Sequence, residues 1–218
     1  MSPAIIEILV LAGIAIFLVL RLKNVLGTRE GFEKPPIQDA PPANNNRDFR
    51  VIEGGEDTDI TDNVDKKSSS AEAMAIMKKV DTEFMVNDFL SGARSAYEMI
   101  LMAFDSVDIS SVQRFLSSEI KENFEEAIQE RDQKGLSIDA EFLGLRDTAI
   151  KNVSFNIKDR VAEISVSFLA DIKSIVKNNQ GEVIEGKEAE TKKQFDVWVF
   201  SREIGSDNPN WILVETGA

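Results

Sequence analysis

Carboxylates are the first side chains in this sequence to consider for catalysis or metal binding, since its 218 residues contain 38 Asp and Glu but neither His nor Cys. That composition excludes thiol catalysis, disulfides, Cys/His zinc sites and a Ser-His-Asp triad. Glu125 with Glu126 and Asp139 with Glu141 are close pairs, but neighbours in sequence do not face one another on a helix. The phosphate-binding glycine motifs are missing from the sequence. We therefore interpret these acids as surface charges and predict no catalytic residue, no metal and no cofactor.

The charge balance narrows the choice of partners. The 25 Lys and Arg leave a formal net charge of −13, and the isoelectric point is about 4.6. A protein that binds nucleic acid neutralises phosphates with clustered basic residues, and this chain has no surplus of them. We therefore predict that nucleic acid is not a partner.

Apolar side chains are better candidates for a binding site. Helices laid over a curved sheet leave a concave interior, and concave apolar surfaces are common binding sites. The alternative is that each aromatic simply fills the core, which needs no further explanation. The candidates for a pocket or partner-binding surface are Phe115, Phe142, Phe168, Phe195, Trp198 and Trp211.

The elements that must position these residues form a helical half and then a strand half, an order typical of α+β proteins. Apolar residues recur at helical spacing over 76–84, 89–104 and about 108–134, and Gly135 follows as a stop signal. Alternation predicts strands over 162–173 and 195–200, with others ending near 157 and covering 211–214. We expect a curved four-stranded antiparallel sheet with the helices packed on one side.

The second predicted helix contains three features that need a reason. Asn87 or Asp88 is expected to cap its start. Gly92 costs about 1 kcal/mol relative to Ala inside a helix, so we expect a close helix or sheet approach there. Arg94, on a mostly apolar helix, is expected to pair with a carboxylate or to cap carbonyls.

The N-terminus carries an uncharged apolar run that begins at Ile8 and ends at Leu20. With its flanks it covers residues 3–22, and twenty helical residues span about 30 Å, the thickness of one hydrocarbon core. Basic residues follow the run, which predicts a single-pass anchor with its C-terminal side in the cytoplasm. The alternatives are a cleaved signal peptide, which lacks a basic start and a cleavage site, and a buried core helix.

Residues 30–70 read as a linker between this anchor (residues 1–29) and the folded domain (residues 71–218). They contain four of the six prolines, runs of Asn and Ser, and an excess of acids. Such a segment cannot bury enough apolar surface to offset its ordering entropy, so we expect a flexible tether.

Four stretches of the chain carry a familiar pattern. Residues 89–100 read F-L-S-G-A-R-S-A-Y-E-M-I, and residues 124–131 fit F-x-x-A-I-x-x-R. Residues 196–202 read D-V-W-V-F-S-R, and residues 207–216 read D-N-P-N-W-I-L-V-E-T. These stretches resemble the Tim-like adaptor family (the TimA family), whose C-terminal domain is shared with the mitochondrial subunit that tethers the import motor to the inner-membrane translocase.

The resemblance implies a cone-shaped α+β domain related to the cystatin-like and nuclear-transport-factor-like folds, with a large apolar pocket. It also implies location at the bacterial inner membrane and protein partners such as translocase or chaperone components. We therefore expect a non-enzymatic adaptor that holds a partner protein or apolar segment near the membrane, in protein translocation or membrane-protein assembly. The rival hypothesis is a domain that binds lipid or another small apolar ligand.

Overall fold

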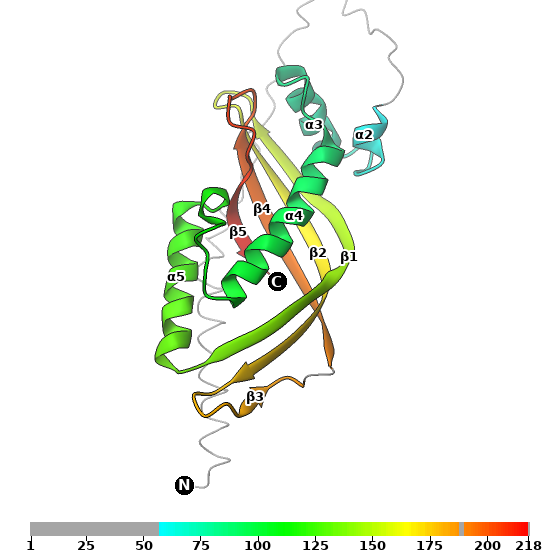
Figure 1. The fold of residues 1–218 in the computed structure, drawn as a ribbon. Helices are drawn as coiled ribbons and strands as arrows, with labels where there is room; N and C mark the ends of the chain where they lie inside the picture. Colours follow the sequence, from blue (N-terminus) through cyan, green and yellow to red (C-terminus); the bar gives the residue numbers. More distant parts are fainter. Residues whose placement is uncertain (1–56, 188–189, 218) are drawn as a thin grey trace, which may run out of the picture. The chain divides into compact units, whose positions relative to one another are not determined.

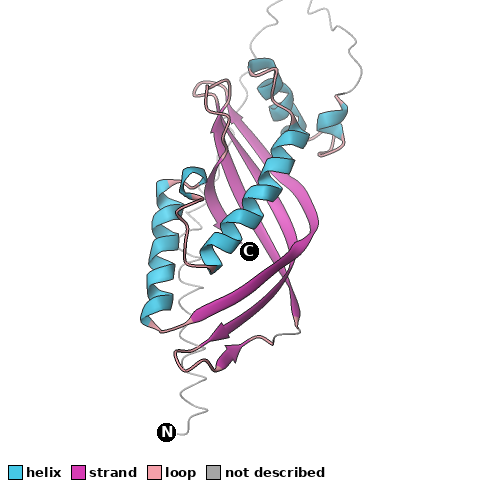
Figure 2. Ribbon diagram, in the orientation of Figure 1, coloured by secondary structure: helices cyan, strands magenta, loops and turns pink. Residues whose placement is uncertain are grey.

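The computed structural model describes residues 57–187 and 190–217. The predicted anchor and most of the predicted linker lie outside these residues. Within the described part, no helix is long and apolar enough to cross a membrane. The described residues form an α+β unit in which helices pack against an antiparallel sheet (Figure 1, Figure 2), which confirms the predicted fold class.

The sheet has five strands among the described residues, and the prediction of four was therefore wrong. The strands run in the order β1-β2-β4-β5, β3 pairs with the C-terminal end of β2, and all pairs are antiparallel. The missed strand is β3, whose three residues are all exposed and show no alternation. The strands are β1 Ser137–Asn156, β2 Val161–Lys177, β3 Val183–Glu185, β4 Thr191–Glu203 and β5 Ile212–Gly217.

Strand β1 explains the curvature of the sheet. It is 20 residues long, and its pairing with β2 shifts register at three places, between residues 142 and 144, 145 and 147, and 150 and 152. Each bulge bends the strand and increases its twist. The sheet therefore curves around the helix that lies across its concave face (Figure 1).

The helices differ from the predicted ones mainly at their ends. The first ends at Val80, so Phe84 lies beyond it, and residues 108–117 are not α-helical. The Ser117 hydroxyl instead caps the last helix by accepting a 3.2 Å hydrogen bond from the Ile120 N–H. Gly135 adopts φ +64°, which confirms the predicted stop. The helices are α2 Thr58–Thr61, α3 Ser69–Val80, α4 Val86–Asp105, the 3₁₀ turn η1 Gln113–Phe115, and α5 Ser118–Gln133.

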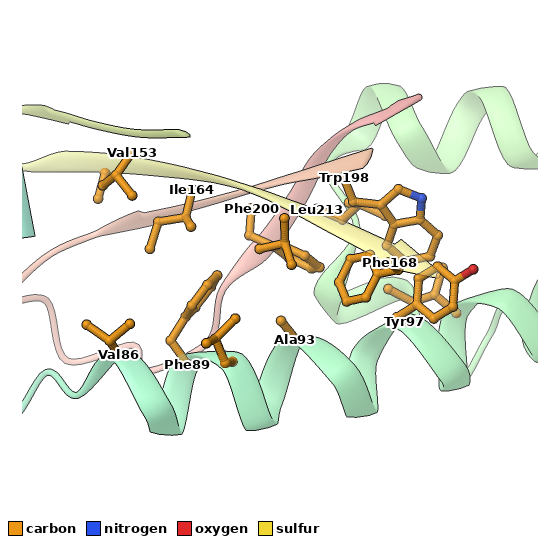
Figure 3. Packing of buried hydrophobic residues seen from close by; sticks show 14 of the residues in the cluster. Val86, Phe89, Ala93, Tyr97, Val153, Ile164, Phe168, Trp198, Phe200 and Leu213 are labelled. Carbon is orange, nitrogen blue, oxygen red and sulfur yellow. The ribbon is translucent and has the colours of Figure 1, made fainter. Parts of the chain in front are cut away.

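Helix α4 lies across the concave face of the sheet and supplies much of the core. Its side chains Phe89, Ala93 and Tyr97 recur every fourth residue and point toward the strands (Figure 3). From the sheet, Phe168 and Phe200 meet them, and both are nearly inaccessible to solvent. One face of α4 therefore belongs to the core.

The N-terminus of α4 is capped from a distant part of the chain. The Asp59 carboxylate accepts hydrogen bonds from the backbone N–H of Val86 at 2.7 Å and of Asn87 at 3.0 Å, and lies 2.7 Å from the Lys78 ammonium. Burial opposes ionisation of Asp59, but the bonds from Lys78 and the two N–H groups outweigh it and lower its pKa. The expectation that Asn87 or Asp88 caps the helix was wrong, and part of the predicted linker is packed onto the domain.

Candidate functional site

An apolar groove lies along the outer flank of α4, between that helix, η1 and the loop before β5. Its volume is about 390 Å³, which lies within the range of about 300–1,000 Å³ typical of binding pockets. From α4 and the turn before it, the lining includes Phe84, Met85, Phe89, Gly92, Ser95, Ala96 and Met99. The other side comes from Phe115 on η1, Phe200 on β4, and residues 209–211.

Aromatic rings in tilted and edge-on contact form the floor of the groove. The Trp211 indole lies 4.6 Å from the Phe89 ring and 6.1 Å from the Phe84 ring, measured between centroids. The other face of Phe89 packs edge-on against Phe200 in the core at 6.1 Å. Aromatic pairs at these separations stabilise one another beyond simple burial. The floor is therefore braced by the core while one face of it stays open.

Two methionines lie at the ends of the groove and are unusually exposed for apolar residues. Met85 is 42% and Met99 46% exposed. Methionine is flexible and polarisable, and it is common on surfaces that accept apolar partners of varied shape. These side chains suit a binding surface better than a closed core.

Gly92 lies midway along the groove, and the reason expected for it was wrong. A Cβ atom at this position would meet nothing within 4 Å, so no helix or strand of the described chain approaches closely there. Its missing side chain instead leaves the middle of the groove open. Ser95 and Ala96, one turn further on, have small side chains that fill little of the groove.

The charges around the groove are unevenly placed. Among the described residues that line the groove, Arg202 is the only basic one, and its guanidinium lies 3.3 Å from the Asp81 carboxylate and donates to the Asn208 carbonyl at 3.2 Å. Glu83 and Asp88 belong to the lining near the start of α4, and both are exposed. The basic group is thus neutralised, whereas two carboxylates face solvent at one end.

The six predicted aromatic residues do not share one site. Phe115 and Trp211 line the groove, whereas Phe168 and Trp198 are buried in the core and Phe142 packs partly buried against it. Phe195 is 50% exposed, and it pairs with Leu169 of β2 while its neighbour Asp196 pairs with buried Phe168. Because side chains alternate along a strand, Phe195 points to the convex face of the sheet, away from α4. Of the six candidates, two therefore line the groove, while the alternative of core filling describes Phe168 and Trp198.

The remaining lining residues were missed because they carry no strong signal in the sequence. Met85, Gly92 and Met99 look like ordinary members of a helix when only spacing is considered. A useful sign was available nevertheless: residues 88, 92, 95 and 99 follow a helical stripe that excludes the core positions 89, 93 and 97.

A buried polar pair lies where α4 crosses β4. The Tyr97 hydroxyl donates a 2.6 Å hydrogen bond to the Asp196 carboxylate, which also accepts one from the Gln194 amide at 2.8 Å. The Tyr97 ring stacks on Phe168 at 4.4 Å, and burial, followed by the Asp196 charge, raises the pKa of its hydroxyl. A tyrosine whose ionisation is suppressed in this way is a poor proton donor at neutral pH, so the pair anchors α4 to the sheet.

Arg131 has the role that was expected of Arg94. Its guanidinium donates to the backbone carbonyls of Phe104 at 2.8 Å and Asp105 at 3.1 Å, at the C-terminal end of α4. Arg131 is buried, and among the described residues its Nε and Nη1 have no hydrogen-bond partner. Arg94 is exposed and forms no hydrogen bond or ion pair within the described part of the chain. The prediction for Arg94 was wrong, and Arg131 is not part of a solvated face.

Metal chemistry finds no support in the described part of the chain, where no three acidic side chains come together in a way that could hold an ion. The described residues define an α+β domain with an open apolar groove.

A comparison with known protein families agrees with the motifs. The model of the Tim44-like domain family matches residues 70–218, and the chain belongs to this family, which confirms the resemblance. Among solved structures, the chain is similar to the intermembrane space region of the chloroplast protein ARC6. The identity is 12% and the TM-score 0.37, over 57% of this chain and 94% of that chain. No curated protein matches the chain.

Proposed function

We propose that this protein is a non-enzymatic, membrane-associated adaptor in protein translocation or membrane-protein assembly, and that its groove binds an apolar segment of a partner protein. The observation that carries the proposal is the open aromatic floor around Trp211, with exposed methionines at both ends. Membership of the Tim44-like domain family supports the adaptor role. Exposed apolar surfaces often mark sites where a partner binds, so an apolar partner is expected there.

In this proposal the N-terminal part of the chain supplies the membrane location. Residues 1–29 anchor the protein in the bacterial inner membrane, and the following linker lets the cytoplasmic domain work at a distance from it. The support is the apolar run of residues 8–20 and the basic residues after it. Chaperone or translocase components are the partners that the family resemblance favours.

The charge of the groove favours a protein over an anionic lipid. Glu83 and Asp88 would repel a phosphate headgroup at the end where they lie. The net charge of −13 on the whole chain acts in the same direction at an anionic surface. A neutral lipid remains the rival occupant, and an experiment can separate the two.

The test is photo-crosslinking in cells that express the full chain with a photoreactive residue at Trp211. The matched control carries the same residue at Phe195, an exposed aromatic on the opposite face of the sheet. We expect discrete protein adducts from position 211 that are weak or missing from position 195. Lipid adducts alone from position 211, or the same adducts from both positions, would contradict the proposed function.

A further inference from the structure

Resting on the proposed function, we infer that the groove's occupant is an amphipathic α-helix of the partner protein that lies along α4 and carries Lys or Arg at the end beside Glu83 and Asp88. Three features of the groove support this: its length, the small residues at its middle and the acidic side chains at one of its ends.

The length of the groove suits a short helix. Its lining along α4 runs from Met85, just before the helix begins, to Met99, and fourteen residues at 1.5 Å each give about 21 Å. A partner helix of three to four turns covers the same distance. Helices that dock in this way present apolar residues at positions i, i+3 or i+4, and i+7.

The middle of the groove permits two helices to approach closely. Gly92 has free space where a side chain would be, and its neighbours along the groove, Ser95 and Ala96, are small. Helix axes usually pack 8–10 Å apart, and the distance falls when the residues at the contact are small. Met85 and Met99, at the two ends, are long enough to close over the ends of such a helix.

The acidic side chains at one end of the groove favour a bound helix whose basic end lies beside them. The exposed carboxylates of Glu83 and Asp88 accept no hydrogen bond and form no ion pair with any residue that the structure describes. At that end, Arg202 is already paired with Asp81. A Lys or Arg on the incoming helix would find two free carboxylates, whereas an acidic residue would meet like charge.

The test measures binding of two fluorescent fourteen-residue helical peptides to the full chain in phosphatidylcholine nanodiscs. The peptides share one apolar face and differ only in having Lys or Glu at both ends. Fluorescence anisotropy gives the affinity, and the emission of Trp211, in a Trp198→Phe background, reports occupancy of the groove. We expect the Lys peptide to bind about three- to tenfold more tightly than the Glu peptide, as two partly exposed ion pairs allow.

Charge variants decide whether the preference belongs to the groove. Glu83→Gln with Asp88→Asn should remove it, whereas the matched control Glu122→Gln with Glu126→Gln changes two exposed acids on α5 and should leave it intact. Gly92→Leu, which fills the groove, should weaken both peptides and provides a check on the site.

The outcomes separate this inference from the proposed function. Equal binding of the two peptides, or loss of preference in the α5 control, would overturn the charged occupant while the cross-linking result stands. If neither peptide binds although position 211 yields protein adducts in cells, the helical occupant is wrong and an extended or larger partner surface replaces it.

Discussion

Trp198 lies within β4 and Trp211 just before β5, and the two tryptophans have opposite surroundings. Trp198, in β4, is 4% exposed and packs against Tyr97 at 4.7 Å and Phe168 at 5.9 Å. Trp211, just before β5, also contacts aromatic rings, yet it is only half buried and lines an open groove. The aromatic cluster around Trp198 is enclosed by α4 and the strands. The aromatic cluster around Trp211 is covered on one side and faces the groove on the other.

The difference teaches that one helix can serve two purposes when its faces are built from different residues. The core face of α4 carries large side chains such as Phe89 and Tyr97, which lock it to the sheet. The groove face carries Gly92, Ser95 and exposed Met99, which leave room for something outside. Substitutions in the first cluster should therefore change stability, and those in the second should change binding.

The largest effect is expected in the closed cluster. Phe168→Ala should lower the free energy of unfolding by about 3–5 kcal/mol, because it opens a cavity next to Tyr97 and Trp198. Urea unfolding followed by circular dichroism measures the loss. Phe195→Ala, one strand away and 50% exposed, is the control and should cost less than about 1 kcal/mol. Equal losses would mean that the convex face is also part of the core.

The next effect concerns the cap that holds the start of α4 and so the position of the groove. Asp59→Ala should lower the free energy of unfolding by about 2 kcal/mol at neutral pH, because two N–H groups lose their acceptor. Asp57→Ala is the control: that carboxylate pairs with Lys78 alone and is 46% exposed.

The same cap predicts a pH dependence. The pKa of Asp59 in the folded state lies below its ordinary value of 3.8, so Asp59 stabilises the fold fully above that value. This contribution is lost as the pH falls through the lower, folded-state pKa. The free energy of unfolding, measured as the pH is lowered, should therefore fall less steeply below pH 3.8 in Asp59→Asn than in the unaltered chain. Parallel curves would show that Asp59 does not titrate with folding.

A smaller effect, of opposite sign, is expected at the groove. Gly92→Ala should stabilise the protein by about 0.5–1 kcal/mol, because the added methyl meets nothing and alanine is the better helix former. Gly135→Ala is the contrasting variant: at φ +64° and against Asn179, it should destabilise. Thermal unfolding measures both. A destabilising Gly92→Ala would mean that the groove is more tightly packed than the structure shows.

The smallest change in stability is expected at the end of the groove. Met99→Ala should alter the free energy of unfolding by no more than about 0.5 kcal/mol, because the side chain is 46% exposed. It should nevertheless reduce the yield of protein adducts from position 211 in the cross-linking experiment. A loss above about 1 kcal/mol would assign Met99 to the core and remove the contrast between the two clusters.

Much of the fold could be predicted because it depends on local pattern. The period of apolar residues indicated the helical half, the alternation in β2 indicated a long strand, and Gly135 indicated the end of α5. Short or irregular elements were not predicted: β3 has only three residues, all exposed, and residues 108–117 have helical spacing of apolar residues but no α-helix. Spacing alone cannot exclude a helix where capping and a positive φ at Val107 interrupt it.

The candidate site was predicted only in part. Phe115 and Trp211 were among the candidates and line the groove, whereas Gly92 was noticed for a packing reason that the structure contradicts. A sequence shows that a glycine is present in a helix, but not whether a neighbour or open space lies opposite. The partner of Arg131 and the acceptor role of Asp59 were likewise out of reach, since both join residues more than twenty positions apart.

The sequence by itself determined the fold class, the family and the exclusion of cysteine and histidine chemistry, because composition, periodicity and motifs are properties of the chain alone. Only the tertiary structure decided which aromatic residues fill the core and which face a groove. The reason is physical: burial depends on what packs against a side chain from distant parts of the chain. Trp198 and Trp211 have the same chemistry, but α4 and the strands together bury Trp198, whereas Trp211 packs on Phe89 and still lines the groove.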